Sequence, residues 1–210
     1  MSIKRRTVLK GMALGSAALA LGQAGLSQAA QATVNLRKPI LVLVSDATAQ
    51  SAFVDGVKAN PSVAQTSLLT VDSSLSCIAD LQQRLSTSKG ERIVGLVDDA
   101  SGILLLDLAR SAGVQVHWVG QHVTKKGNSR HRVSVTEKTS SCVQQFAEFA
   151  QGCSRPMAIT EQTLAANRHW ASSLGFALAS LDPSRRYLRT TPPKHNHAVD
   201  GHFVSFSIET

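Results

Sequence analysis

The sequence is poor in the residues and motifs that mark several common classes of protein. Only 4% of its 210 residues are aromatic, which leaves few rings for a surface that stacks nucleic-acid bases. The phosphate-binding patterns G-x-G-x-x-G and G-x-x-x-x-G-K-[ST] are absent, and so is the nucleophile motif G-x-S-x-G. These absences disfavour a nicotinamide enzyme, a nucleoside-triphosphate enzyme and an α/β-hydrolase.

Cysteine is also scarce, with Cys77, Cys142 and Cys153 in the whole chain. No C-x-x-C occurs, so neither a thioredoxin-like site nor a zinc ribbon is indicated. Cys142 and Cys153 flank a helical pattern, SCVQQFAEFAQGC. Eleven residues of straight helix rise about 16 Å, well beyond the Cα separation of a disulfide. The two can pair only if the helix ends between them, and three unpaired buried thiols remain the alternative.

Long hydrophobic runs and acidic residues are few. After residue 32 the most leucine-rich stretch, residues 103–108, is short and contains Asp107, so it falls far short of the roughly 20 apolar residues that span a membrane. The net charge is +8, and half of it comes from basic residues within the first ten positions. The remainder of the chain therefore carries +4, an ordinary value for a soluble domain. Charge and composition together argue against a nucleic-acid partner.

The N-terminus has the layout of a secretory signal. A basic cluster precedes a mildly apolar run at residues 12–21 (MALGSAALAL), and small residues end at Ala30-Gln31-Ala32. The run is too short and too weakly apolar for a spanning helix. Within the basic cluster, the sequence resembles the twin-arginine (Tat) family of export signals at Arg5, Arg6, Leu9 and Lys10. Lys4 and Val8 depart from the residues most common in that family.

The resemblance implies a 32-residue signal, cleaved after Ala32 or, as a close second, after Ala29. It implies passage through the Tat translocase in the folded state, and a mature protein in the periplasm of a Gram-negative-type bacterium. Tat passengers often carry a cofactor acquired in the cytoplasm, or accompany a periplasmic redox partner that does. No residue of the mature chain identifies such a cofactor.

The mature chain, residues 33–210, is expected to be a single domain. Residues 33–120 alternate between short β-branched runs such as PILVLVS and amphipathic segments, which indicates βαβ units. We predict a three-layer α/β fold with a mainly parallel sheet, Rossmann- or flavodoxin-like in outline. Strands are expected at residues 39–45, 67–71, 92–97 and 114–119, and helices at 48–60, 76–86 and 101–112.

Residues 121–210 follow a less regular pattern. Residues 120–132 (GQHVTKKGNSRHR) are basic and polar and predict an exposed loop. This stretch either binds an anionic ligand or an acidic partner protein, or is a solvated hairpin. A short strand at 132–137, helices at 140–151 and 161–181, and a proline-containing connector at 182–200 are expected to follow. HFVSFSI at residues 202–208 predicts a closing strand, which we place at an edge of the sheet.

Ligands of open α/β sheets bind beyond the carboxyl ends of the strands. The polar residues expected there nominate a ligand site: Ser45, Asp46, Thr48, Asp72, Asp98, Asp99 and His122. Asp and Ser after a strand also cap helices, and Asp46, Ser74 and Asp99 stand at expected cap positions. We favour capping slightly over a binding cluster.

A second nomination is a metal site at His195, His197 and His202, since H-x-H can hold copper or zinc through neutral imidazoles. No fixed ligand spacing accompanies them, so a polar surface stretch is the simpler interpretation.

A short segment, ILVLVSD followed by FVDGVKANP, is similar to the opening strand and helix of one lobe of type I periplasmic binding proteins. The pattern is generic to α/β chains. The leading hypothesis is a non-catalytic periplasmic protein that binds a small ligand or serves an exported redox system. The alternatives are an enzyme that uses the strand-end carboxylates, with or without a metal, and a metal carrier.

Overall fold

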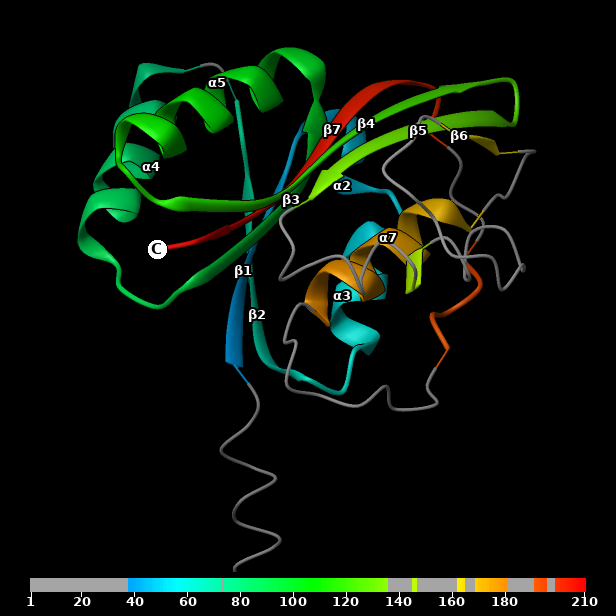
Figure 1. Ribbon diagram of the computed structural model, residues 1–210, viewed down its shortest axis with the longest axis horizontal. Coiled ribbons are helices and arrows are strands. Elements are labelled where there is room, and N and C mark those ends of the chain that lie inside the picture. Colours follow the sequence, from blue (N-terminus) through cyan, green and yellow to red (C-terminus); the bar gives the residue numbers. More distant parts are fainter. Residues whose placement is uncertain are drawn as a thin grey trace, which may run out of the picture. The chain divides into compact units, whose positions relative to one another are not determined.

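A seven-stranded sheet organises the part of the chain that the structure describes. The computed structural model describes residues 38–72, 74–135, 145–146, 162–164, 169–180, 191–195 and 199–210. The strands are β1 (Lys38–Val44), β2 (Val63–Thr70), β3 (Arg92–Asp98), β4 (Gln115–Lys125), β5 (Asn128–Val135), β6 (Gln162–Leu164) and β7 (Gly201–Glu209). The helices are α2 (Asp46–Ala49), α3 (Phe53–Ala59), α4 (Leu75–Thr87), α5 (Asp99–Ser111) and α7 (Trp170–Ala179). Their arrangement appears in Figure 1.

The strand order is β2-β1-β3-β7-β4-β5-β6. β1 pairs in parallel with both β2 and β3, while the four pairs from β3 to β6 are antiparallel. β1 to β4 and β6 consequently run in one direction, and only β5 and β7 oppose them. The predicted α/β class and Rossmann-like outline are confirmed.

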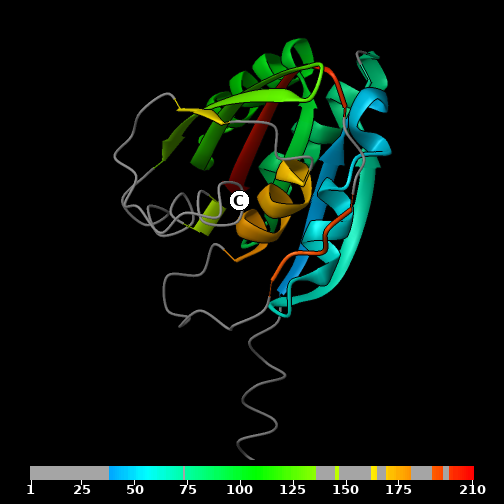
Figure 2. The ribbon, with the colours of Figure 1, turned by 90° about the vertical axis from the view of Figure 1, so that its right-hand side faces the viewer.

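Helices cover both faces of the sheet, as Figures 1 and 2 show. Alternate residues of β1 enter two separate cores, because successive strand side chains point to opposite faces. Ile40, Val42 and Val44 pack toward α3 and α7. Leu41 and Leu43 pack toward α4 and α5. The structure is therefore three layers deep.

Two glycines bring α3 and α7 into backbone contact. A Cβ atom at Gly56 would lie 2.0 Å from the carbonyl oxygen of Ser172, and one at Gly175 would lie 2.1 Å from that of Phe53. Side chains at these positions would force the helices apart. All ten residues of α7 are buried, so this close approach fixes the helix that forms much of one core.

Several expectations need correction. β7 is not an edge strand, because it lies between β3 and β4 and six consecutive residues are buried. The basic stretch after residue 120 is not a loop but a β-hairpin, with a two-residue turn at Lys126 (φ 50°) and Gly127 (φ 79°). The expected helix over 161–181 is replaced by β6 and the shorter α7, and the helix over 48–60 is broken into α2 and α3.

Some expectations concern parts of the chain outside the described residues: the predicted signal segment, Cys142, Cys153, His197 and most of the expected helix at 140–151. Within those residues, no helix has the length and apolar character needed to cross a membrane.

Candidate functional site

A cavity of about 570 Å³ opens at the carboxyl ends of β1, β2 and β3. Val44 at the end of β1 is level with Thr70 of β2 and with Leu96 of β3, so the segments after the three strands meet at one edge of the sheet. The cavity is lined by Ser45, Asp46, Ala47, Val71, Asp72, Ile78, Leu81, Asp98, Ala100, Ser101, Leu104, Leu105 and Leu108. Four of the seven residues nominated from the sequence are among them.

The lining has an apolar wall and an acidic rim. Aliphatic side chains come mainly from the facing sides of α4 and α5: Ile78, Leu81, Leu104, Leu105 and Leu108. The rim carries the carboxylates of Asp46, Asp72 and Asp98. Among the described residues that line the cavity, none is basic. The surface therefore suits a molecule with an apolar body and a cationic or hydroxyl-bearing end.

Asp98 caps α5. One carboxylate oxygen accepts the backbone N–H of Ser101 over 3.0 Å, and the other accepts its hydroxyl over 2.8 Å. Partial burial raises the pKa of Asp98, but the hydrogen bonds from Ser101, together with smaller contributions from its own backbone and from Ser45, hold it below its usual value. Both oxygens are thus engaged, and the group stays ionised at neutral pH.

Asp72 is similarly occupied, although it is exposed. Its Oδ1 accepts the backbone N–H of Ser74 over 3.0 Å and also the Ser74 hydroxyl. These bonds lower the pKa of Asp72. Ser74 in turn caps α4 by accepting the backbone N–H of Cys77 over 3.2 Å.

Asp46 differs from the other two acids. It is exposed in the first turn of α2. Within the described part of the chain, no hydrogen bond or ion pair engages its carboxylate. Asp46 is therefore the rim carboxylate best able to meet a ligand.

Ser45 and Thr48 stabilise the rim of the cavity through buried hydrogen bonds. The Thr48 hydroxyl is fully buried, donates to the carbonyl of Leu96 over 2.5 Å, and accepts the backbone N–H of Ser45 over 2.9 Å. The Ser45 hydroxyl oxygen accepts the backbone N–H of Asp98 over 3.1 Å. Thr48 is consequently a support for the end of β1 and does not line the cavity.

The remaining two nominated residues lie elsewhere. Asp99 is exposed in the first turn of α5 and is not part of the lining. His122 lies on the other face of the sheet, stacked on Trp170 of α7. The N-cap residues of α2 and α5 are Ser45 and Asp98, each one residue before the expected Asp46 and Asp99. Ser74 is the N-cap of α4, as predicted.

Within the described residues, the C-terminal histidines do not come together as a set of metal ligands. His195 Nδ1 lies 2.8 Å from a carboxylate oxygen of Asp55, and His202 is exposed on β7. His197 is outside the described residues. Among the residues placed by the structure, no group of three or more His, Cys, Asp or Glu side chains is positioned to hold a metal ion.

Sequence reasoning missed a buried polar cluster between the sheet and α7. Trp118 Nε1 donates a hydrogen bond of 2.8 Å to the hydroxyl oxygen of Ser205. The same oxygen lies 2.7 Å from His122 Nε2. His122 Nδ1 is 2.6 Å from Nδ1 of His131. The sequence signal for this cluster was the alternation of inward and outward side chains, since His122 and His131 occupy inward positions of β4 and β5. The alternation was missed because the stretch was interpreted as a loop.

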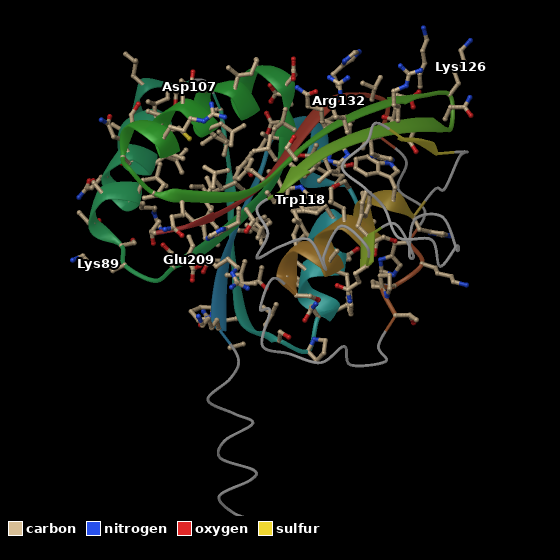
Figure 3. All side chains as sticks on the ribbon, in the orientation of Figure 1. Lys89, Asp107, Trp118, Lys126, Arg132 and Glu209 are labelled. Carbon is tan, nitrogen blue, oxygen red and sulfur yellow. The ribbon has the colours of Figure 1, made fainter. Side chains whose placement is uncertain are left out.

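The basic residues of the hairpin occupy its outer face. Lys125, Arg130 and Arg132 are exposed, between the buried Thr124, Ser129 and His131. Figure 3 shows Lys126 at the tip and Arg132 directed away from α3 and α7. The hairpin form suggested for this stretch is confirmed, and its exposed face is cationic.

Comparison with models of protein families, with curated proteins and with solved structures finds no match to this chain. The fold and the cavity define it as a three-layer α/β protein with a pocket at the carboxyl ends of β1, β2 and β3.

Proposed function

We propose that the protein is an exported, non-catalytic binding protein that takes a small organic ligand into the strand-end pocket. The observation that carries the proposal is the cavity itself. It lies where parallel strands end, and it is lined by Ser45, Asp46, Asp72 and Asp98. Such edges are the usual ligand sites of open α/β sheets.

The chemistry of the rim favours binding over acid–base catalysis. A general base needs a pKa near the working pH and a free oxygen directed at its substrate. The pKa of Asp98 and that of Asp72 are both lowered. Hydrogen bonds from Ser101 occupy both oxygens of Asp98, and those from Ser74 occupy Oδ1 of Asp72. Ionised and engaged carboxylates of this kind supply a negative potential instead of removing protons.

The ligand class follows from the lining. An aliphatic wall offers favourable burial to an apolar body, at about 25 cal/mol per Å². Asp46 offers an unengaged carboxylate at the mouth, and the lining contains no cation to compensate for it. The best match is an amphipathic molecule with an ammonium group, and a neutral hydroxyl-bearing molecule of the same shape should bind more weakly.

Isothermal titration calorimetry with n-hexylammonium and n-hexanol tests this proposal. Asp46→Asn should weaken binding of the amine about two- to fivefold, as expected for one exposed charge–charge contact, and should leave the alcohol nearly unchanged. Asp107→Asn is the matched control, because Asp107 is an exposed acid of α5 outside the pocket.

The apolar wall is tested separately. Leu104→Asn should weaken both compounds, because Leu104 lines the cavity, whereas Ile103→Asn should weaken neither. The proposal fails if both lining variants bind like their controls, or if the unmodified protein binds neither compound.

A further inference from the structure

The β4–β5 hairpin places two histidines together inside the core, on the face of the sheet opposite the strand-end pocket. His122 is 1% exposed and His131 is 2% exposed. The His122 ring stacks on Trp170 at 5.2 Å between centroids, and the His131 ring lies 5.0 Å from Trp170. The ring of Phe146 stands edge-on to His131 at 5.5 Å. The pair therefore joins the hairpin to the first residue of α7.

A row of hydrogen bonds fixes the pair at one end. The indole of Trp118 can only donate, so the Ser205 oxygen is its acceptor. The tautomers that use every donor and acceptor of this row have Ser205 donating to His122 Nε2, and His122 donating from Nδ1 to His131 Nδ1. Gly120 leaves the room that this convergence needs, because a Cβ there would lie 2.5 Å from the Ser205 oxygen.

The other end of the row is unsatisfied. His131 Nε2 is buried without a hydrogen-bond partner among the described residues, and so are Ser129 Oγ and Gln145 Oε1. Each unsatisfied buried polar group costs about 1–3 kcal/mol relative to its hydrated state. The attachment of the hairpin is thus weakened locally before any charge is introduced.

Among the described residues, no carboxylate is placed as a counter-ion for a proton on either ring. The described residues that face the pair carry no acid: Trp118, Gly120 and Thr124 of β4, Ser129 and Val133 of β5, Phe203 and Ser205 of β7, Trp170 of α7, and Gln145 and Phe146. The nearest titratable group on α7 is His169 at its N-cap, whose Nδ1 lies 3.2 Å from the carbonyl of His195. The charged side chains on the reverse side and turn of the hairpin are cations: Lys125, Lys126, Arg130 and Arg132. At the turn, the carboxylate of Asp200 accepts the backbone N–H of Lys126 over 3.2 Å.

Burial lowers the pKa of His131 to about 4. Burial, with a smaller contribution from His131, lowers the pKa of His122 well below its ordinary value. Both rings are accordingly neutral at pH 7. Acidification must charge them in an apolar site, and the cheapest response is to expose them to water.

We propose that His122 and His131 form an acid-sensitive latch, which holds the β4–β5 hairpin against Trp170 when neutral and releases it when protonated. Beyond Trp118 the inward face of the hairpin is polar apart from Val133. Release concerns this outer part of the hairpin, and it must also break the β4–β7 pairs from Gly120↔Ser205 to Thr124↔Gly201. β1 and β3, whose inward residues are aliphatic, have no such titratable group in their cores. Opening would uncover the aromatic cluster of Trp170, Phe146 and Phe203.

Hydrogen–deuterium exchange of the full chain tests the latch. Protection factors, corrected for the intrinsic pH dependence of exchange, are compared at pH 7 and pH 4.5. The amides of residues 120–134 should lose at least tenfold protection relative to those of β1 and β3. Loss of protection in all three regions together, or in none, would overturn the proposal.

Two variants and a titration complete the test. Replacing both rings, as His122→Phe with His131→Leu, should abolish the selective acid response, whereas His202→Gln, on the exposed side of β7, should retain it. If the double variant fails to fold, NMR titration of the imidazoles in the unmodified protein decides. Protonation that coincides with hairpin exchange supports the latch, and ordinary titration near pH 6.5 with the hairpin closed contradicts it.

Discussion

The hydroxyl oxygen of Ser45, at the end of β1, accepts the backbone N–H of Asp98, at the end of β3, over 3.1 Å. This bond joins two sides of the strand-end pocket. Ser45 is 4% exposed, so water cannot readily replace the hydroxyl. The rim of the pocket is thereby held in place before any ligand arrives, as expected of a preformed site.

Removing that hydroxyl should be costly. Ser45→Ala leaves the Asp98 N–H unsatisfied, and we expect a loss of about 1–3 kcal/mol in the free energy of unfolding. Ser111→Ala, at the exposed end of α5, is the control and should change stability by less than about 0.5 kcal/mol. Urea denaturation measures both, and equal effects would show that the Ser45 bond contributes nothing specific.

The two adjacent acids at the start of α5 should behave differently. Asp98→Ala removes the N-cap and should cost about 0.5–2 kcal/mol of unfolding free energy. Asp99→Ala removes the same charge from an exposed first-turn position and should cost about 0.5 kcal/mol or less. Thermal unfolding of the two variants compares them directly. A larger loss for Asp99→Ala would place the cap one residue later than the structure does.

Because α3 and α7 are in backbone contact, adding one methyl group between them should strongly reduce the stability of the fold. Gly56→Ala should destabilise the protein by about 3 kcal/mol or more, because the new Cβ would overlap a backbone oxygen and not a movable side chain. Gly90→Ala meets no neighbouring atom but has φ +73°, so it should cost only about 1 kcal/mol. Similar melting temperatures for the two variants would contradict the close helix crossing.

The free energy of unfolding should decrease as the pH is lowered from about 6.5, at pH values still above those at which carboxylates titrate. The folded-state pKa of His131 is about 4, below the ordinary value of about 6.5 for an unfolded chain. A depressed histidine pKa stabilises the fold fully above about pH 6.5, and this stabilisation is lost progressively as the pH falls toward 4. For His131 alone the loss approaches about 3 kcal/mol, and His122 adds to it in the same direction.

Urea midpoints measured from pH 7.5 to pH 4.5 test this dependence. Asp98 does not interfere, since a lowered carboxylate pKa affects stability only as the pH falls through and below the unfolded value of about 4. His202→Gln should follow the parent protein closely. A midpoint independent of pH over this range would mean that the buried rings are already solvated or charged.

Local patterns in the sequence were sufficient for the first half of the fold. Hydrophobic runs such as residues 39–45 and the helical spacing of Leu81 and Leu85 specify buried strands and covering helices. The order of strands then places Asp46, Asp72 and Asp98 at one edge. That part of the candidate site follows from topology alone.

The remainder depends on pairing between distant segments. The insertion of β7 between β3 and β4 matches Val94 with Ser207 and Gly120 with Ser205, and no local pattern reveals such partners. The hairpin was hidden because its charged residues suggested a loop, although they alternate with inward side chains. His122 therefore seemed to belong to the strand-end pocket, whereas its neighbours are His131 and Trp170.

The most direct test of ligand binding in the strand-end pocket is a ¹⁵N NMR titration of residues 33–210, the predicted mature protein, with n-hexylammonium as the probe. Binding in the strand-end pocket should give saturable shifts concentrated at residues 45–47, 71–72 and 98–108, which contribute to the cavity. Shifts with n-hexanol at the same concentrations should be much smaller. Shifts centred on the β4–β5 hairpin, or no saturable shift at the strand ends, would contradict binding in that pocket.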